Sequence, residues 1–483
     1  MLVRAVGSES AAEVWTGVGG LKAPVVLSAS EWAGQQFGQV NLGDKRLNRR
    51  TLEIGSKMAE HPDYSLPNQM EGRSATIGAY GLLNNKRVTM EALLQPHCKQ
   101  TLAAAGRIQV VLMVEDTTEL DYTAHPSKKG LGPIGDGKGQ GLLLHSTLAV
   151  IPEGKEILGL THAQVVLRQP APPRRPHRSG SPEGQVWEVS AQTVGSPPEG
   201  VLWVHVSDRD SDIFEYMMAC LDRGKHFLVR AFHNRVLSWE DEEPQMGEAE
   251  AHLLDYVRSL PAQPGVGYIV HVEARNKQAA REAQVVLQWT QVLINPPVKG
   301  PKELRQRAPI TAWVLRVWEP DAPTGAEPVE WILLSSLPIT TKEEAYRAVD
   351  WYSCRWLCED FHQCIKTGCH VEKTQLDDGE DVKRLLGFVL PIGVRLLQLR
   401  QAARNTPDLP AVAVVEPLMV EVLGRRKKKD VQNMTIAEFW KAVAGLGGHQ
   451  GRRSDGPPGW RTVWRGWCKL ADLTEGARLY APV

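Results

Sequence analysis

Three carboxylates in this chain of 483 residues have the spacing of a metal-dependent active site. Asp116 ends the apolar run 108–116 and Asp208 follows the apolar run 201–206, so both are predicted at the ends of buried strands. Glu359 lies on a later helical segment that could pack on the same sheet. Clustered acids repel one another, whereas hard divalent cations prefer oxygen ligands. The acids therefore predict a site where two metal ions about 4 Å apart bind the attacking and leaving oxygens of a phosphoryl transfer.

The segment Thr341–Gly368 is predicted to be the one helix that presents Glu359. Thr341 and Glu344 fit a capping box at its start, and Gly368 is a plausible C-cap. At about 100° per residue, an arc of about 60° holds four functional side chains: Tyr352, Arg355, Glu359 and Lys366. The opposite side is apolar and is predicted to be buried, whereas the functional arc should face outward: Cys354, Leu357, Cys358, Phe361 and Ile365.

Each feature has a simpler interpretation when it is taken alone. The helix could be an ordinary amphipathic helix with a solvated face, and each acid could be a cap or a surface charge. The order strand–acid, strand–acid, helix–acid favours the active site over these alternatives.

The remaining elements follow in blocks along the chain. Residues from 30 to about 105 have a helical pattern, in which Asn41–Asp44 forms a turn and cap before a compact basic stripe. Further strands are predicted at 142–150, 158–167 and 226–232, with a proline-rich loop at 169–183 and a helix at 212–221. The 234–338 segment contains four strand-like runs and is a β-rich insertion: 266–274, 283–292, 310–318 and 329–335. The tail from about 387 is helical and includes the basic run 425–429, read as a solvated loop or a nucleic-acid contact.

Composition limits the setting and the partners. The net charge is zero, so a nucleic acid would have to be bound by local basic patches. Seven cysteines, four of them between 354 and 369, argue for reduced thiols and a cytosolic protein. No apolar run approaches the roughly 18 residues of a membrane helix, and we expect neither a membrane span nor a signal peptide.

Several motifs resemble those of a known family. The chain is similar to bacterial DDE transposases of the cut-and-paste insertion-sequence group that includes the transposase of transposon five. The late helix contains that group's Y-x2-R-x3-E-x6-K signature as Tyr352, Arg355, Glu359 and Lys366. The first acid lies in Glu115-Asp116-Thr117-Thr118, and the second lies in 208–213. Shorter matches run in family order from about Trp32 to the C-terminus, including His145-Ser146 and the 227–230 segment.

The resemblance implies an α/β fold: a ribonuclease H-like catalytic core, a mixed sheet flanked by helices, with a β-rich insertion. It implies a helical DNA-end-binding domain at 30–105, the catalytic domain at 106–386 and a helical dimerisation region at 387–483. The preceding 1–29 segment mixes small, polar and apolar residues, and we expect a loose extension there. Asp116, Asp208 and Glu359 would be the catalytic residues and hold two Mg²⁺ or Mn²⁺ ions. The partners would be the transposon's inverted-repeat ends, target DNA and a second copy of the chain, in the bacterial cytoplasm.

The implied reaction is cut-and-paste transposition. A hydrolytic nick frees a 3′-OH, a hairpin forms and is opened, and the 3′-OH attacks target DNA. Tyr352, Arg355 and Lys366 would grip 5′ phosphates beside the cut, and Trp331 would stack on an extruded base, unless it is a core tryptophan. Further DNA contacts are implied at two arginines near the active site and at five cations of the N-terminal domain: Arg230, Arg209, Lys45, Arg46, Arg49, Arg50 and Arg73.

Some positions depart from the family pattern. Asp210 and Ser211 replace the familiar Glu and Ala, and Gly141–Leu144 lacks the usual tryptophans. The cysteines near Glu359 are unexpected, and a structural zinc site is the less favoured explanation because close Cys-x2-Cys pairs are missing. Two other functions stay open: a DNA-end-binding or inhibitory relative without chemistry, and a host nuclease on the same core.

Overall fold

One mixed sheet runs through the middle of the molecule, with Asp116 in one of its strands and Asp208 directly after another. The computed structural model describes residues 3–5, 29–169, 182–238, 252–272, 280–405, 407–413, 415–427, 433–452, 458 and 460–480. Twelve strands join in the order β1-β9-β10-β11-β12-β7-β6-β2-β4-β3, with β5 beside β4 and β8 beside β10. The part of the sheet around Asp116 and Asp208 comprises β2 (Val110–Asp121), β4 (Gly139–Ile151), β5 (Glu156–Val166), β6 (Leu202–Ser207) and β7 (His226–Arg230).

The strand order defines the fold class. β2 pairs antiparallel with β4 and parallel with β6, and β6 pairs parallel with β7. The order β5-β4-β2-β6-β7 thus combines a meander with two parallel crossovers, which pass through helices α6 (Pro182–Val194) and α7 (Phe214–Leu221). This mixed sheet flanked by helices is the predicted ribonuclease H-like arrangement.

The strands predicted in the insertion extend this sheet and do not form a separate layer. β12 pairs with β7 through Leu333 and Arg230, so the insertion continues from the catalytic edge. Helix α8 (Leu253–Ser259) packs against β11, and α9 (Lys302–Arg305) lies between β10 and β11 in the chain. The remaining strands are β1 (Val3–Ala5), β3 (Gly132–Ile134), β8 (Leu237–Ser238), β9 (Gly267–Val272), β10 (Arg281–Ile294), β11 (Ile310–Trp318) and β12 (Glu330–Ser335).

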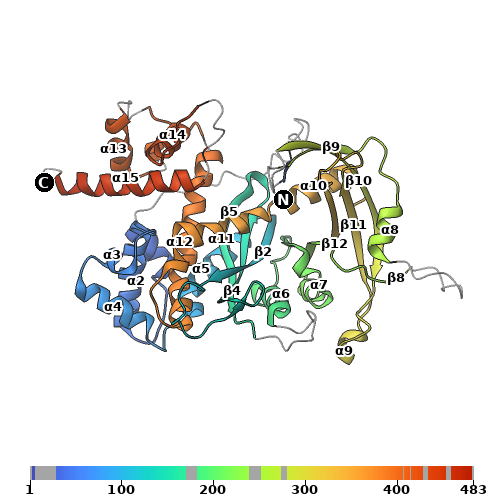
Figure 1. Cartoon of the computed structure of the whole chain (residues 1–483), viewed down its shortest axis with the longest axis horizontal. Coiled ribbons are helices and arrows are strands. Elements are labelled where there is room, and N and C mark those ends of the chain that lie inside the picture. The colour runs from blue at the N-terminus through green and yellow to red at the C-terminus, as the bar shows by residue number, and fades with distance from the viewer. Residues whose placement is uncertain are drawn as a thin grey trace, which may run out of the picture.

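Two helical groups lie on one side of the sheet (Figure 1). The N-terminal group contains α1 (Ala29–Phe37), α2 (Lys45–Glu60), α3 (Leu66–Met70), α4 (Arg73–Leu83) and α5 (Met90–Ala105). The C-terminal group contains α12 (Gly379–Asn405), α13 (Pro417–Lys427), α14 (Ile436–Leu446) and α15 (Trp460–Tyr480). The predicted turn before the basic stripe is present, because the Asp44 side chain accepts from the Arg46 N–H and caps α2.

Three predicted features lie partly or wholly outside the described residues. Of the 1–29 extension, only β1 and the first residue of α1 are described. Of the proline-rich loop, residues 170–181 lie outside, and the prediction of a loop at 182 and 183 is wrong because α6 starts at Pro182. The basic run 425–429 begins as the last turn of α13, and residues 428 and 429 lie outside.

The prediction that Asp116 ends its strand is wrong. β2 continues to Asp121, because its antiparallel pairing with β4 extends to the Asp121–Gly141 pair. Its parallel pairing with β6 stops at the Val114–Val206 pair. Asp116 therefore lies where β2 has lost one neighbour and kept the other.

The segment predicted as one helix consists of three. α10 (Lys342–Ser353) begins with the predicted capping box, α11 covers Trp356–Gln363, and a π-helical turn covers Cys364–Gly368. At the junction, Cys354 N–H donates to the Trp351 carbonyl and Arg355 N–H donates to the Tyr352 carbonyl. These bonds span three residues, as in a 3₁₀-helix, and not the four residues of an α-helix. The five residues predicted to form the apolar face are all buried: Cys354, Leu357, Cys358, Phe361 and Ile365.

Helix α12 lies directly on the end of this segment. A Cβ atom at Gly393 would come within 2.7 Å of Ile365 Cγ2 and 3.0 Å of Phe361 Cε2. The glycine thus permits a close approach between α12 and the helix that contains Glu359. The domain boundary predicted at 386–387 falls inside α12.

In the described residues, we find no helix with the length and apolar character needed to cross a membrane.

A buried histidine joins the N-terminal helices to the sheet. His97 of α5 lies 2.5 Å through Nδ1 from Gln36 Oε1 of α1, and its Nε2 accepts the Leu160 N–H of β5 at 3.0 Å. Because Nε2 must keep its lone pair, this arrangement requires the neutral ring. Burial lowers the pKa of His97 from 6.5 to about 4.

We expect His97 to make the fold sensitive to acid. Between pH 6.5 and about 4 the unfolded chain binds a proton that the folded chain refuses, so stability falls as the pH falls. The contribution is about 3 kcal/mol over this window. H97Q retains an acceptor but does not titrate, so its deficit in unfolding free energy should shrink by that amount from pH 7.5 to 4 in urea titrations. A deficit independent of pH would contradict the assignment.

Candidate active site

The sheet register brings Asp116 and Asp208 to the same level. In the parallel ladder of β2 and β6, the last pair is Val114 with Val206, and each acid lies two residues further along its strand direction. Neighbouring strands are about 4.8 Å apart, so the acids project beside each other where the two strands separate. The side chain of Asp208 also caps the short 3₁₀ turn Arg209–Ser211 by accepting from Asp210 N–H at 3.1 Å.

Arg355 brings Glu359 to this pair. One guanidinium nitrogen, Nη1, lies 2.7 Å from Glu359 Oε1 and 3.9 Å from Asp116 Oδ2. The Arg355 side chain is 9% exposed and that of Glu359 is 41% exposed. A single buried cation is thus shared between the acid of the helix and the acid of the strand.

The electrostatics of Asp116 reflect both its burial and the neighbouring acids. Burial first, then the carboxylates of Asp208 and Glu359, raise the pKa of Asp116 to about 7, although Arg355 lowers it. Burial acts against the charge of Arg355, but Tyr352 and the three acids raise its pKa above the usual value. The site therefore has an excess of negative charge that a cation would relieve.

The residues present suit a hard divalent cation. Three carboxylates supply only oxygen donors, which Mg²⁺ and Mn²⁺ prefer. In the arrangement seen across the described residues, however, no three Asp, Glu, His or Cys side chains converge closely enough to hold a metal ion. Arg355 occupies one oxygen of Glu359, so Glu359 would have to release that contact to become a ligand.

The predicted outward face of the helix is instead largely turned into the protein. Tyr352 and Arg355 are buried, and the Tyr352 ring packs against Trp331 of β12 with centroids 6.2 Å apart. Trp331 is 9% exposed, and Arg230 of β7 donates from Nη2 to the Glu330 carbonyl at 2.9 Å. The prediction of a fully exposed functional face is wrong because α10 packs against β6 and β7 and its Tyr352 packs against Trp331 of β12.

Two more predicted DNA contacts lie at the edges of this group. Arg209 is exposed next to Asp208. Lys366 is half-buried, with Nζ 3.8 Å from Glu372 Oε1, and it helps to lower the pKa of Asp121, after the hydrogen bonds from Thr123. Lys366 therefore lies toward the far end of β2 and not between the acids.

The five predicted N-terminal contacts are all exposed. They lie at the starts of α2 and α4, and they are Lys45, Arg46, Arg49, Arg50 and Arg73. The Arg50 guanidinium covers Gly78 of α4, with 3.0 Å between Cζ and a Cβ atom placed there, so the two helices present one basic surface.

The cysteines near Glu359 are packing residues in this structure. Cys354, Cys358 and Cys364 are buried in the main hydrophobic core. All seven cysteines lie in the described part of the chain, and none forms a disulfide. Burial raises the pKa of the Cys354 thiol to about 12, which keeps it protonated.

One residue of the site was missed in the sequence. His362 of α11 is buried, and its Nδ1 lies 3.9 Å from Asp116 Oδ2. Burial lowers its pKa to about 3, so the ring is neutral at physiological pH. At about 100° per residue, counted from Tyr352 as zero, His362 falls at about 280° and Arg355 at about 300°. The helical spacing alone could therefore have identified His362 as a neighbour of Arg355.

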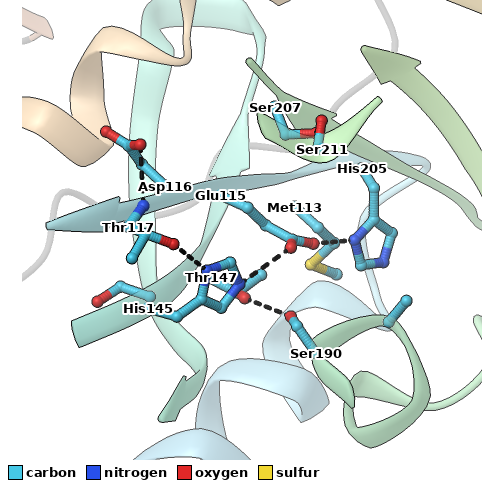
Figure 2. Close-up of polar contacts among 12 residues, drawn as sticks. Met113, Glu115, Asp116, Thr117, His145, Thr147, Ser190, His205, Ser207 and Ser211 are labelled. Carbon is cyan, nitrogen blue, oxygen red and sulfur yellow. Dashed lines mark hydrogen bonds and ion pairs between the residues drawn. The ribbon is translucent and has the colours of Figure 1, made fainter. Parts of the chain in front are cut away.

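A buried polar network behind Asp116 was also missed (Figure 2). Glu115 points to the opposite face of β2 and contacts His205 Nδ1 of β6 through Oε1 and His145 Nε2 of β4 through Oε2, the latter at 3.3 Å. His145 Nδ1 lies 2.9 Å from the Thr117 hydroxyl. Burial alone would raise the pKa of Glu115, but His205 and His145 lower it to about 2. The three central strands are thus tied together next to the catalytic acids.

Comparison with known families identifies the two ends of the chain. Residues 29–88 match the family model described as transposase DNA-binding. Residues 391–482 match the one described as the transposase Tn5 dimerisation domain. These two domains mark a Tn5-like transposase. The predicted resemblance, the DNA partner and the homodimer are confirmed.

In this Tn5-like chain, one matched region precedes the three acids in the sequence and the other follows them. The basic surface of α2 and α4 lies within the DNA-binding match, and α13 to α15 lie within the dimerisation match. Residues 89–390, which include Asp116, Asp208 and Glu359, lie outside both matches. The assignment of catalytic residues therefore depends on the geometry described above.

We expect Glu115 to be essential for the stability of this core. E115Q leaves two buried histidines without their charged partner, and breaking a buried pair typically costs about 3–5 kcal/mol. The unfolding free energy from urea titration near neutral pH should fall by about that amount.

E119Q is the matched control, because Glu119 lies on the same strand and its pair with Arg168 at 3.3 Å is partly exposed. Partly exposed pairs contribute roughly 0–1 kcal/mol. Equal stability of E115Q and E119Q would show that the network does not support the sheet.

Proposed function

We propose that this chain is a DDE transposase that moves DNA by cutting and pasting. Water attacks the phosphodiester at each transposon end and frees a 3′-OH. That hydroxyl attacks the opposite strand to give a hairpin, a second hydrolysis opens the hairpin, and the 3′-OH then attacks target DNA. Each step exchanges one phosphodiester oxygen for another, with no covalent protein–DNA intermediate.

The observation that supports this proposal is that acids from three separate elements surround the buried guanidinium of Arg355. Asp116 and Asp208 come from paired strands, and Glu359 reaches them through Arg355. Structural carboxylates rarely gather at the cost of mutual repulsion unless a cation is required. The DNA-binding and dimerisation domains on either side indicate that the substrate is DNA, bound by two copies of the chain.

Asp116, Asp208 and Glu359 would hold two Mg²⁺ or Mn²⁺ ions. When bound, such ions activate the attacking oxygen and stabilise the leaving oxygen. The pKa of Asp116, raised to about 7, means that a neighbouring positive charge would favour its ionised form. The proposed setting is the bacterial cytoplasm, where the chromosome provides both donor and target DNA.

The remaining groups of the site would bind and orient the DNA. Arg355 is buried and Arg230 is half-buried, and each guanidinium can bind a phosphate in bidentate fashion. Tyr352 supplies a hydroxyl between them, and Lys366 supplies a point charge further along the helix. Arg209 and the five N-terminal cations would contact more distant phosphates.

The first test removes the charge of Glu359. E359Q should still bind the inverted-repeat ends that flank the reading frame but should lose nicking with Mg²⁺ by roughly a thousandfold or more, because a metal ligand contributes several kcal/mol. E343Q is the control, since Glu343 is exposed on the preceding helix α10.

Nicking by E359Q at the rate of E343Q would refute the metal-ligand role. End binding without nicking by the unmodified protein would favour the inhibitory relative. Nicking without paired ends and without strand transfer would favour a host nuclease.

The second test separates hairpin formation from the first nick. If Trp331 stacks on an extruded base, W331F should slow hairpin formation about tenfold while the nick proceeds. W331A removes a ring that is only 9% exposed and should also destabilise the fold by about 3–5 kcal/mol. W318F, on the neighbouring strand β11, is the control, and equal slowing of both steps by W331F would argue against stacking.

A further inference from the structure

An exposed phenyl ring lies at the edge of the sheet where Asp208 follows β6, because β7 runs parallel to β6 with Val229 opposite Ser207. Phe232 is 59% exposed, and it follows β7 two residues after Arg230. Its ring contacts the neighbouring His233 edge-on, with centroids 5.3 Å apart. Tyr64 is also an exposed ring, but its hydroxyl donates a hydrogen bond to Asp472 Oδ1 at 3.0 Å. The phenyl ring of Phe232 has no hydroxyl that could make such a bond. Exposing a large apolar ring is unfavourable in water unless it contacts a partner.

The backbone under Phe232 is held firmly. The buried carboxylate of Asp212 accepts through Oδ2 from the N–H groups of Phe232 and His233, at 2.8 and 2.7 Å. Its Oδ1 lies 2.7 Å from Arg235 Nη2. Charge-assisted hydrogen bonds of this kind are the stronger class. The ring is therefore presented from a fixed turn and not from a loose loop.

This turn is attached to both sides of the active site. Asp212 follows the catalytic Asp208 by four residues, at the end of the 3₁₀ turn that Asp208 caps. On the other side, Ala231 N–H donates to the Ile332 carbonyl at 2.8 Å, one residue from Trp331. The turn that holds Phe232 is thus hydrogen-bonded to Asp212, close in sequence to Asp208, and to Ile332, the residue after Trp331.

Cations gather at the same edge of the sheet, where Arg230 ends β7 beside the end of β6. Burial lowers the pKa of Arg230, and the nearby cations Arg209 and Arg355 lower it further. Three guanidinium groups therefore gather at one edge of the site, where they suit a polyanion. An aromatic ring beside such cations is the combination that binds single-stranded nucleic acid, with phosphates on the charges and a base on the ring.

We propose that Phe232 is a second DNA-stacking residue, which takes an unpaired base of the DNA end next to the scissile phosphate. Asp212 is the positioning residue that fixes the ring. The proposal depends on the proposed DNA chemistry for its substrate but not on cleavage. The Phe232 ring is exposed and open to a base, whereas the Trp331 ring is buried and packs against Tyr352.

The experiment reads stacking directly. A duplex with the inverted-repeat sequence flanking the reading frame contains 2-aminopurine opposite an abasic site, placed in turn at each terminal position. Binding to the full-length protein in the E359Q background should quench the fluorescence at one position. F232A should abolish most of that quenching, and F232W should restore it, because the indole ring also stacks on a base and offers a larger face than phenyl.

The controls separate stacking from folding and from chemistry. Removing a ring that is mostly exposed leaves no cavity, so F232A should melt within about 2 °C of the parent protein. I269A, which shortens another exposed apolar side chain on β9, should leave the quenching unchanged. In cleavage-competent protein with Mg²⁺, F232A should slow hairpin formation roughly tenfold.

Unchanged quenching in F232A at every position would overturn the assignment, whether or not the unmodified protein cleaves DNA. Loss of quenching only in W331F would overturn it as well and assign the base to Trp331. Nicking retained by E359Q would instead refute the proposed metal site, and would leave the fluorescence result for Phe232 standing.

Discussion

The structure depends on keeping three carboxylates together around the buried guanidinium of Arg355. Two like charges about 4 Å apart repel by roughly 4 kcal/mol at the effective dielectric constant of a protein surface. Arg355 offsets this cost by lying between Asp116 and Glu359, and the neutral His362 fills the space on the remaining side without adding charge. The buried guanidinium thus compensates internally for charge that the proposed metal ions would otherwise neutralise.

The same constraint explains the other face of the sheet. A strand that bears an exposed acid cluster on one face needs a rigid attachment on the other, and Glu115 provides it by bridging His145 and His205. Its bonds cross three strands, of which β2 contains Asp116 and β6 is followed directly by Asp208. Asp212 has the corresponding role for the turn after β7, so buried carboxylates with complete sets of partners hold both sides of the site.

The sequence was informative where a residue's role follows from local pattern. Apolar runs located β2 and β6, and helical spacing located Glu359 with its arc. The sequence was not sufficient where the end of an element depends on a partner far away in the chain. β2 continues past Asp116 only because β4 pairs with it as far as Gly141. The burial of Tyr352 and Arg355 likewise depends on β12 and β7, and Phe232 carried no motif at all. Its significance comes from exposure, which depends on the whole fold.

Helix α12 shows why the terminal domains and the acids form one unit. It packs on α5 and α2 of the DNA-binding side, on β5 of the sheet, on the π-turn after Glu359 and on α14 of the dimerisation side. Its Gly393 admits Ile365 and Phe361 at contact distance, so the helix axis is coupled to the position of the Glu359 helix. Because α12 begins before the dimerisation match and continues into it, pairing of two chains and placement of the third acid share one rigid element.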